Sequence, residues 1–185
     1  MTKTEARKLA KARRAAVDLH TVGHAMTGVL FTLPAWQHAD TVLAFASMPD
    51  EPDTADILRQ ALAEGKRLLL PRVLSRTEMD WVEITALSQL QPGAYGILEA
   101  PASLPAFDTA HLGDDALALI PCLAASPDGV RLGRGGGYYD RFLAHYKGRR
   151  LLVCPTAALL GDLPCEGWDV RFSPHEILTE KGILL

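Results

Sequence analysis

The sequence has few cysteines and no long apolar run, and these shortages exclude several classes of protein. Its only three cysteines are Cys122, Cys154 and Cys165, and no two of them have Cys-x-x-Cys spacing. An odd count without that spacing argues against a disulfide framework or a zinc ribbon, and favours reduced thiols. The longest apolar stretch, residues 116–125, contains a proline and is far shorter than the roughly 20 residues of a membrane-spanning helix.

The sequence also has no excess of positive charge. With 19 basic and 22 acidic residues, its formal net charge is −3. We therefore expect neither nucleic acid nor an anionic membrane as a partner. The first residues are charged and lack the apolar core of a signal peptide, so we expect a cytoplasmic protein. The 185 residues suit one domain, 1–185, with ample hydrophobic residues for a core, and we expect a monomer.

Short apolar segments alternate with helical patterns, which indicates an α/β fold with a mostly parallel sheet. We expect strands at 41–46, 67–71, 79–84, 116–121, 150–154 and 176–179. We expect helices at 4–32 (one helix or two), at 54–64 with Thr54 as its cap and Gly65 at its end, and at 138–146. Residues 86–108, rich in glycine and proline, predict an irregular loop.

Ligands of such sheets bind at the carboxyl ends of the strands. The loops that follow Ala46, Pro71 and Pro121 should therefore share one crevice.

The most informative segment is 131–143, which reads Arg-Leu-Gly-Arg-Gly-Gly-Gly-Tyr-Tyr-Asp-Arg-Phe-Leu. Its four glycines permit positive φ angles and a close approach of backbone to ligand, and successive N–H groups in such a turn bind anions. Arginine matches the geometry of phosphate, and Asp140 offers oxygen ligands to Mg²⁺. The segment thus has the ingredients of a nucleotide-phosphate site. The alternative is a tight glycine-rich connection whose arginines face solvent.

Standard phosphate motifs do not describe this segment. Tyr138 stands where the dinucleotide fingerprint needs glycine or alanine, and no Gly-x-x-x-x-Gly-Lys-Ser/Thr occurs.

A second basic feature is a stripe on the predicted N-terminal helix, formed by Lys3, Arg7, Lys11 and Arg14 at helical spacing. By itself this stripe is typical of a solvated helix face.

The order of residues over 120–143 closely resembles the signature of the 5-formyltetrahydrofolate cyclo-ligase family. Residues 120–124, Ile-Pro-Cys-Leu-Ala, are similar to the family's Val-Pro-Gly-Leu-Ala strand end, and Asp128 and Gly129 occupy the turn before the loop. The resemblance implies cyclisation of 5-formyltetrahydrofolate to 5,10-methenyltetrahydrofolate, with ATP as co-substrate, Mg²⁺ as cofactor, and release of ADP and phosphate. It also implies a three-layer α/β/α fold similar to those of sugar-phosphate isomerases and CoA transferases.

The same resemblance implies roles for individual residues. Lys3-x-x-x-Arg7-Lys8 is similar to the family's N-terminal ATP-binding element, with Ala6 in place of leucine. The implied ATP-binding residues are Lys3, Arg7, Arg131, Leu132, Gly133, Arg134, Gly135, Gly136, Gly137, Tyr138 and Tyr139. The implied catalytic residues are Arg134, Tyr138 and Asp140, and the implied Mg²⁺ ligands are Asp140 and Asp169.

On the folate side, residues 47–54 resemble the family's segment whose glutamate binds the pterin ring. Glu51 is the matching carboxylate, able to accept two N–H donors, although the segment also reads as an acidic loop before a helix. The implied folate-binding residues are Ala46, Glu51, Arg134, Gly135, Gly136, Gly137 and Tyr138. The loop 93–101 resembles a family loop, with Leu98 in place of proline, and makes Tyr95 and Glu99 further pocket candidates.

The chain departs from the family pattern near its C-terminus. Residues 163–170 resemble the element that carries the second metal-binding aspartate, Asp169, but Trp168 stands where histidine is common. Ser173 also replaces a usual aspartate, so Asp169 is alternatively a surface residue after a turn. These changes leave open an inactive folate- or nucleotide-binding paralogue. A phospho-sugar or CoA-handling enzyme on the same kind of fold is the other alternative. His20 and His24, four residues apart, make a poor metal pair without further ligands.

Overall fold

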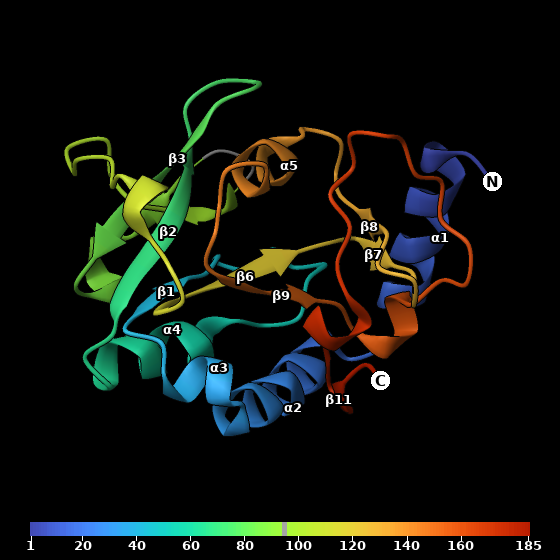
Figure 1. Ribbon diagram of the computed structural model, residues 1–185, viewed down its shortest axis with the longest axis horizontal. Coiled ribbons are helices and arrows are strands. Elements are labelled where there is room, and N and C mark those ends of the chain that lie inside the picture. Colours follow the sequence, from blue (N-terminus) through green and yellow to red (C-terminus); the bar gives the residue numbers. More distant parts are fainter. Residues whose placement is uncertain (94–95) are drawn as a thin grey trace.

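A twisted sheet forms the middle of the computed structural model, which describes residues 1–93 and 96–185 (Figure 1). Its seven strands within those residues are β1 (Thr41–Leu43), β2 (Arg67–Val73), β3 (Met79–Ile84), β6 (Ala116–Pro121), β9 (Arg149–Val153), β10 (Ile177–Thr179) and β11 (Gly182–Ile183). They lie in the order β11-β10-β9-β6-β1-β2-β3. The strands from β10 to β2 are parallel, and β3 and β11 join the edges antiparallel. The predicted α/β fold with a mostly parallel sheet is confirmed.

Helices cover both faces of this sheet, which gives the expected three layers. The helices are α1 (Lys3–Ala15), α2 (Leu19–Thr32), α3 (Pro34–Gln37), α4 (Ala55–Ala63) and α5 (Tyr138–Leu143). In Figure 1, α2, α3 and α4 lie below the sheet and α5 lies above it. Helix α1 lies at one end, beside the short hairpin of β7 (Ala124–Ala125) and β8 (Arg131–Leu132).

The remaining elements are short. A small hairpin pairs β4 (Gln91–Pro92) with β5 (Leu98–Glu99), inside the segment expected to be irregular. Single 3₁₀ turns form at η1 (Leu87–Gln89), η3 (Thr109–His111), η4 (Thr156–Ala158) and η5 (Pro174–Glu176).

The strands are buried on both faces, and successive side chains divide between two cores. Val42 and Leu68 pack toward α2 and α4, whereas Leu43 and Leu69 join the cluster that contains Leu143 of α5. This alternation follows from the two-residue period of a strand. Burial on both faces explains why the strands read as continuous apolar runs in the sequence.

The segment 4–32 forms two helices, not one, and the second begins where Asp18 accepts a hydrogen bond from the His20 N–H at 3.1 Å. Helix α5 ends at Leu143, three residues before the predicted end. Tyr146 lies beyond the helix, where its hydroxyl donates to the Arg149 carbonyl at 3.1 Å and its ring packs on Phe142.

Thr54 is the N-cap residue of α4, as predicted, but its side chain makes no capping hydrogen bond. Its hydroxyl donates to the Phe45 carbonyl at 2.6 Å and accepts from the Ser47 N–H at 3.1 Å. The side chain of Asp53 instead accepts from the Ala55 N–H at 2.8 Å. Thr54 therefore ties down the loop that follows β1.

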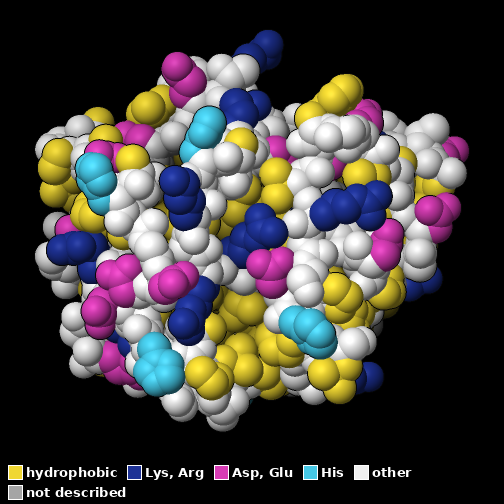
Figure 2. Space-filling model, viewed as in Figure 1, with side chains coloured by type: hydrophobic (Ala, Val, Ile, Leu, Met, Phe, Trp, Pro, Cys, Tyr) yellow, Lys and Arg dark blue, Asp and Glu magenta, His cyan; other side chains and the backbone are white. Residues whose placement is uncertain are grey.

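The surface is mixed in character. Figure 2 shows basic and acidic side chains intermixed over one face of the molecule. Among the described residues, none of the helices combines the length and the apolarity that spanning a bilayer requires.

Candidate active site

A large cavity of about 970 Å³ lies at the carboxyl ends of the parallel strands. The chain crosses from β1 to β2 on one side of β1, and β6, β9 and β10 follow on the other side. The point where strand order reverses is where open α/β sheets bind ligands. The cavity is lined by Ala46 and Glu51 after β1, Val73 at the end of β2, and Leu123 after β6. The three loops expected to share a crevice do so.

The glycine-rich loop joins β8 to α5 and forms one wall of the cavity. Gly135 has a φ of 104° and Gly137 a φ of 68°, both in the region that side chains disfavour. A Cβ at Gly137 would also lie 2.6 Å from a terminal nitrogen of Arg141, and one at Gly135 would lie 3.3 Å from Arg7. Because these glycines lack a Cβ, the cationic side chains can approach the backbone of the loop closely.

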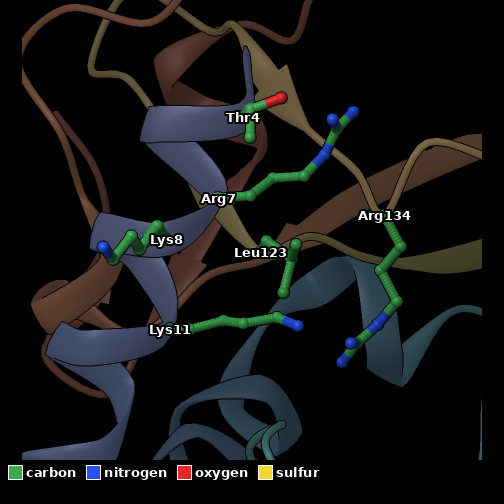
Figure 3. Close-up of a pocket in the computed structure, with 6 residues that line it drawn as sticks. All are labelled: Thr4, Arg7, Lys8, Lys11, Leu123 and Arg134. Atoms are coloured by element: carbon green, nitrogen blue, oxygen red, sulfur yellow. The ribbon is translucent and has the colours of Figure 1, made fainter. Parts of the chain in front are cut away.

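Arg7 is one of these cations and reaches the loop from α1. Its Nε donates to the Gly133 carbonyl at 3.0 Å, while its terminal nitrogens make no hydrogen bond or ion pair with the described residues. Figure 3 shows Arg7 and Lys11 extending from α1 toward the side of Arg134, while Lys8 points away. These residues line a smaller pocket of about 310 Å³ that shares Arg7, Leu123 and Arg134 with the large cavity.

Arg134 forms an ion-pair network with two carboxylates from the loop after β1. Its Nη2 lies 2.5 Å from Asp50 Oδ1 and 3.0 Å from Glu51 Oε1. Glu51 is buried, and its second oxygen accepts from the Met48 N–H at 2.9 Å. Partial burial acts to raise the pKa of Asp50, but the hydrogen bond and charge of Arg134 outweigh it and hold that pKa below its usual value. The structure therefore brings together the predicted loop arginine and the predicted folate carboxylate.

Arg131 is buried and engaged by protein groups. One terminal nitrogen donates to the Pro121 carbonyl at 3.1 Å, and the other lies 3.0 Å from both carboxylate oxygens of Asp140. Its Nε is buried and has no hydrogen-bond partner among the described residues. These contacts fix Asp140 at the cavity wall, which favours a positioning role for Arg131.

Asp169 lines the same cavity from the C-terminal segment. Its carboxylate lies 2.8 Å from Lys3 Nζ, and Glu166 lies 3.4 Å from the same ammonium. Partial burial acts to raise the pKa of Asp169, but the hydrogen bond and charge of Lys3 lower it overall. Burial likewise acts to lower the pKa of Lys3, but the hydrogen bond and charge of Asp169 raise it.

The residues that line the cavity fit Mg²⁺ only when it is shared with a ligand. Asp140 and Asp169 are both hard oxygen donors, but each is paired with a cation. Within the described part of the chain, no group of three or more His, Cys, Asp or Glu side chains is placed to hold a metal ion. Mg²⁺ is commonly bound through one or two carboxylates together with substrate phosphates, and this donor set suits that arrangement. His20 and His24 instead pair with Asp53 and Asp56.

The two predicted tyrosines occupy different positions on the cavity wall. Tyr138 donates its hydroxyl to the Ser75 carbonyl at 2.7 Å, so it bridges to the loop after β2. Tyr139 packs its ring edge-on against Trp81 at a centroid distance of 6.3 Å. Burial raises the pKa of Tyr139 well above its usual value, so the residue is a neutral wall of the cavity.

Other predicted residues also line the cavity, while one lies outside the described residues. Leu132 and Glu99 line it, and Leu132 packs in a core cluster as well. Tyr95 lies in the undescribed pair 94–95.

Arg14 is the residue whose role the sequence pattern misassigned. It belongs to the basic stripe, yet it is 1% exposed and donates to the carbonyls of Cys122, Leu123 and Asp50. Its guanidinium thus joins the strand end before the glycine-rich loop to the loop that carries Glu51. The usable signal was the four-residue spacing of Ala6, Ala10 and Arg14, which form the buried face of α1.

Comparisons with known proteins point to one family. The model of the 5-formyltetrahydrofolate cyclo-ligase family matches residues 2–180. A 5-formyltetrahydrofolate cyclo-ligase of Mycolicibacterium smegmatis is 30% identical over 152 residues, covering 78% of this chain and 76% of the relative. One from Escherichia coli K12 is 32% identical over 146 residues, covering 76% and 79%.

Solved structures show the same fold. The NMR structure of Aquifex aeolicus 5,10-methenyltetrahydrofolate synthetase superposes with a TM-score of 0.84 at 26% identity, covering 100% of this chain and 92% of that one. A Mycoplasma pneumoniae 5,10-methenyltetrahydrofolate synthetase superposes with a TM-score of 0.74 at 21% identity, covering 97% and 99%. The chain belongs to the 5-formyltetrahydrofolate cyclo-ligase family, whose enzymes are ATP-dependent ligases of folate one-carbon metabolism.

Proposed function

We propose that residues 1–185 form a single, monomeric, cytoplasmic domain that converts 5-formyltetrahydrofolate and ATP to 5,10-methenyltetrahydrofolate, ADP and phosphate. The observation that supports this most is the ion pair between Arg134 and Glu51 inside the cavity. It joins a phosphate-type glycine loop to a buried carboxylate suited to an aminopyrimidinone ring. A cavity of this size at the strand-order reversal can hold two ligands side by side.

The chemistry requires activation of a formamide. Its oxygen is a poor leaving group, so transfer of the γ-phosphoryl group to that oxygen first gives an iminophosphate and ADP. The N10 amine then attacks the activated carbon, the five-membered ring closes, and the C–O bond breaks to release phosphate. Phosphoryl transfer depends mainly on positioning and on stabilisation of charge, which is what the loop, Lys3, Arg7 and Arg134 supply.

Glu51 and Arg134 change partners when both ligands bind. The ring N–H groups of folate compete with Arg134 for the Glu51 carboxylate. The guanidinium released from Glu51 then turns toward the phosphates beside its own loop, where it offsets charge on the transferred group. Tyr138 and Ala46 line the cavity next to this pair and keep water from the formyl group.

Two carboxylates of the cavity wall suit a metal ion that is shared with a nucleotide. Asp140, held by Arg131, and Asp169, held by Lys3, would bind Mg²⁺ together with ATP. Bound Mg²⁺ neutralises negative charge on the phosphate oxygens.

A near-ultraviolet absorbance assay tests the proposal. Purified protein is mixed with 5-formyltetrahydrofolate, Mg²⁺ and ATP, and parallel samples omit ATP or Mg²⁺. We expect the methenyl chromophore to grow only when all components are present. Binding of both ligands without chromophore growth would instead indicate an inactive paralogue, and absence of folate binding would contradict the proposal.

A further inference from the structure

Trp168 is an exposed indole at the wall of the active-site cavity. It is 75% exposed, the largest apolar side chain on the described surface, and it lines the 970 Å³ cavity. Among the described residues it makes no hydrogen bond, ring contact or cation–π contact. An aromatic ring left uncovered beside a ligand cavity is a typical contact surface for a flat ligand group.

The backbone around Trp168 is fixed. The Asp169 N–H donates to the Glu166 carbonyl at 3.0 Å, and the Glu166 N–H donates to the Asp169 carboxylate at 2.8 Å. Lys3 bonds both acidic side chains, so this turn is fastened to the start of α1. The backbone that carries the indole is therefore held in place, while the faces of the ring stay free.

The position of the turn around Trp168 indicates whether the indole contacts the nucleotide or the folate. Trp168 is attached to the α1 side of the cavity through Lys3, whereas Glu51 belongs to the loop after β1. The glycine-rich loop and Arg7 lie on the cavity wall with them. Under the proposed function, Lys3, Arg7 and Asp169 serve the nucleotide, so Trp168 lies on the nucleotide side of the cavity, and the flat group of that ligand is its base.

We propose that Trp168 stacks on the adenine base of ATP and contributes to nucleotide affinity. This inference rests on the proposed function, because it assumes that the phosphates lie on the glycine-rich loop. Stacking between an aromatic side chain and a base depends on the π-face and not on hydrogen-bond donors.

Tryptophan fluorescence tests the contact directly. Trp36 is 1% exposed and Trp81 is 3% exposed, so acrylamide should quench Trp168 almost alone. With excitation at the red edge, ADP and Mg²⁺ should lower the quenching slope severalfold. Tripolyphosphate with Mg²⁺ should leave that slope unchanged, because it carries no base. Protection by tripolyphosphate, or by 5-formyltetrahydrofolate alone, would overturn the assignment to the base.

Variants separate the base from the phosphates. Trp168→Ala should raise the KM for ATP on the order of tenfold, with little change in the KM for folate, and Trp168→Phe should restore most of the loss. Inhibition by tripolyphosphate should be equal in all three proteins. Leu74→Ala serves as the control, since Leu74 is an exposed apolar residue that does not line the cavity.

The outcomes also separate this inference from the proposed function. An active wild-type enzyme with an unchanged KM for ATP in Trp168→Ala would overturn the stacking contact alone. Equal increases in both KM values would also overturn it and assign the turn a structural role. A wild-type protein that neither binds ADP nor forms the methenyl product would overturn both.

Discussion

At the scale of single residues, ligand binding at this site depends on a few charged side chains, of which Glu51 and Arg134 form one pair. Glu51 is buried, so its charge needs partners, and the Met48 N–H and Arg134 provide them. A buried carboxylate held by exchangeable partners is ready to accept donors from a ligand. The affinity for folate should therefore depend on the charge of this one side chain.

Glu51→Gln tests that dependence. The amide keeps the size of the side chain but replaces one charged acceptor with a donor, so the KM for 5-formyltetrahydrofolate should rise about tenfold. The KM for ATP should change much less. Steady-state kinetics with each substrate varied in turn measures both values, and Glu83→Gln on the surface of β3 is the control. Equal effects on the two KM values would indicate a structural role for Glu51.

Arg134→Ala tests the loop arginine. Removing a guanidinium that stabilises charge in phosphoryl transfer should lower kcat about 100-fold. The free energy of unfolding should fall by about 1–3 kcal/mol, because the buried Glu51 carboxylate loses its cation and keeps the Met48 N–H as a partner. Arg59→Ala, which breaks an exposed pair with Asp56, is the control for stability. Near-wild-type turnover in Arg134→Ala would contradict the assigned role.

Residue roles were predictable where a motif fixed them and not elsewhere. The glycine-rich loop and Glu51 were found because their neighbours in the sequence carry the family resemblance. The structural role of Arg14 was not predicted from the sequence, because its hydrogen-bond acceptors are backbone carbonyls 36 to 109 residues away. A charge pattern on one helix does not reveal such distant acceptors.

At the scale of elements, helix α2 contains two glycines, and only one of them is required for close packing. Sequence propensity treats Gly23 and Gly28 alike, as residues that weaken a helix. In the structure a Cβ at Gly23 would lie 2.4 Å from the backbone nitrogen of Asp53, whereas a Cβ at Gly28 would meet nothing within 4 Å. Gly23 therefore allows the helix to pack on the segment before α4, and Gly28 does not have this function.

Two alanine substitutions in α2 should therefore have effects of opposite sign. Gly28→Ala should stabilise the protein by about 0.5–1 kcal/mol, because alanine loses less backbone entropy in a helix. Gly23→Ala should destabilise it by at least about 1–3 kcal/mol, because the backbone of Asp53 must shift. Urea unfolding of both variants measures the difference. Two effects of the same sign would show that close packing at Gly23 does not matter.

The order of elements was predictable because the buried strands carry unbroken apolar runs. The ends of the helices were harder to predict from the sequence, since they depend on contacts with other elements. The hydroxyl of Thr54 has the chemistry of a helix cap but bonds the Phe45 carbonyl, an acceptor that exists only once β1 and α4 are packed.

At the scale of the whole molecule, the site is assembled from both ends of the chain. Lys3 and Asp169 are 166 residues apart in sequence and 2.8 Å apart in the structure. This contact brings α1 together with the segment that carries Trp168, at the wall of the cavity. Closing so long a loop costs entropy, and the ion pair helps to offset that cost.

Asp169→Asn should reveal that contribution through its dependence on pH. The pKa of Asp169 lies below its usual 3.8 because the bond to Lys3 outweighs the effect of burial, which acts in the opposite direction. A carboxylate with a depressed pKa stabilises the fold above its unfolded pKa, and this stabilisation is lost as the pH falls through the folded value. Lys3, with its raised pKa, stays protonated throughout that range.

Wild type should therefore exceed Asp169→Asn in free energy of unfolding by on the order of 1 kcal/mol at pH 7. The difference should shrink toward zero as the pH falls from about 5 through the lowered pKa of Asp169. Urea denaturation at intervals of pH measures it. Asp162→Asn is the matched control, because Asp162 lies in the same segment, is exposed, and makes no ion pair within the described residues. A difference that stays constant across this range would show that the Lys3–Asp169 pair does not stabilise the folded chain.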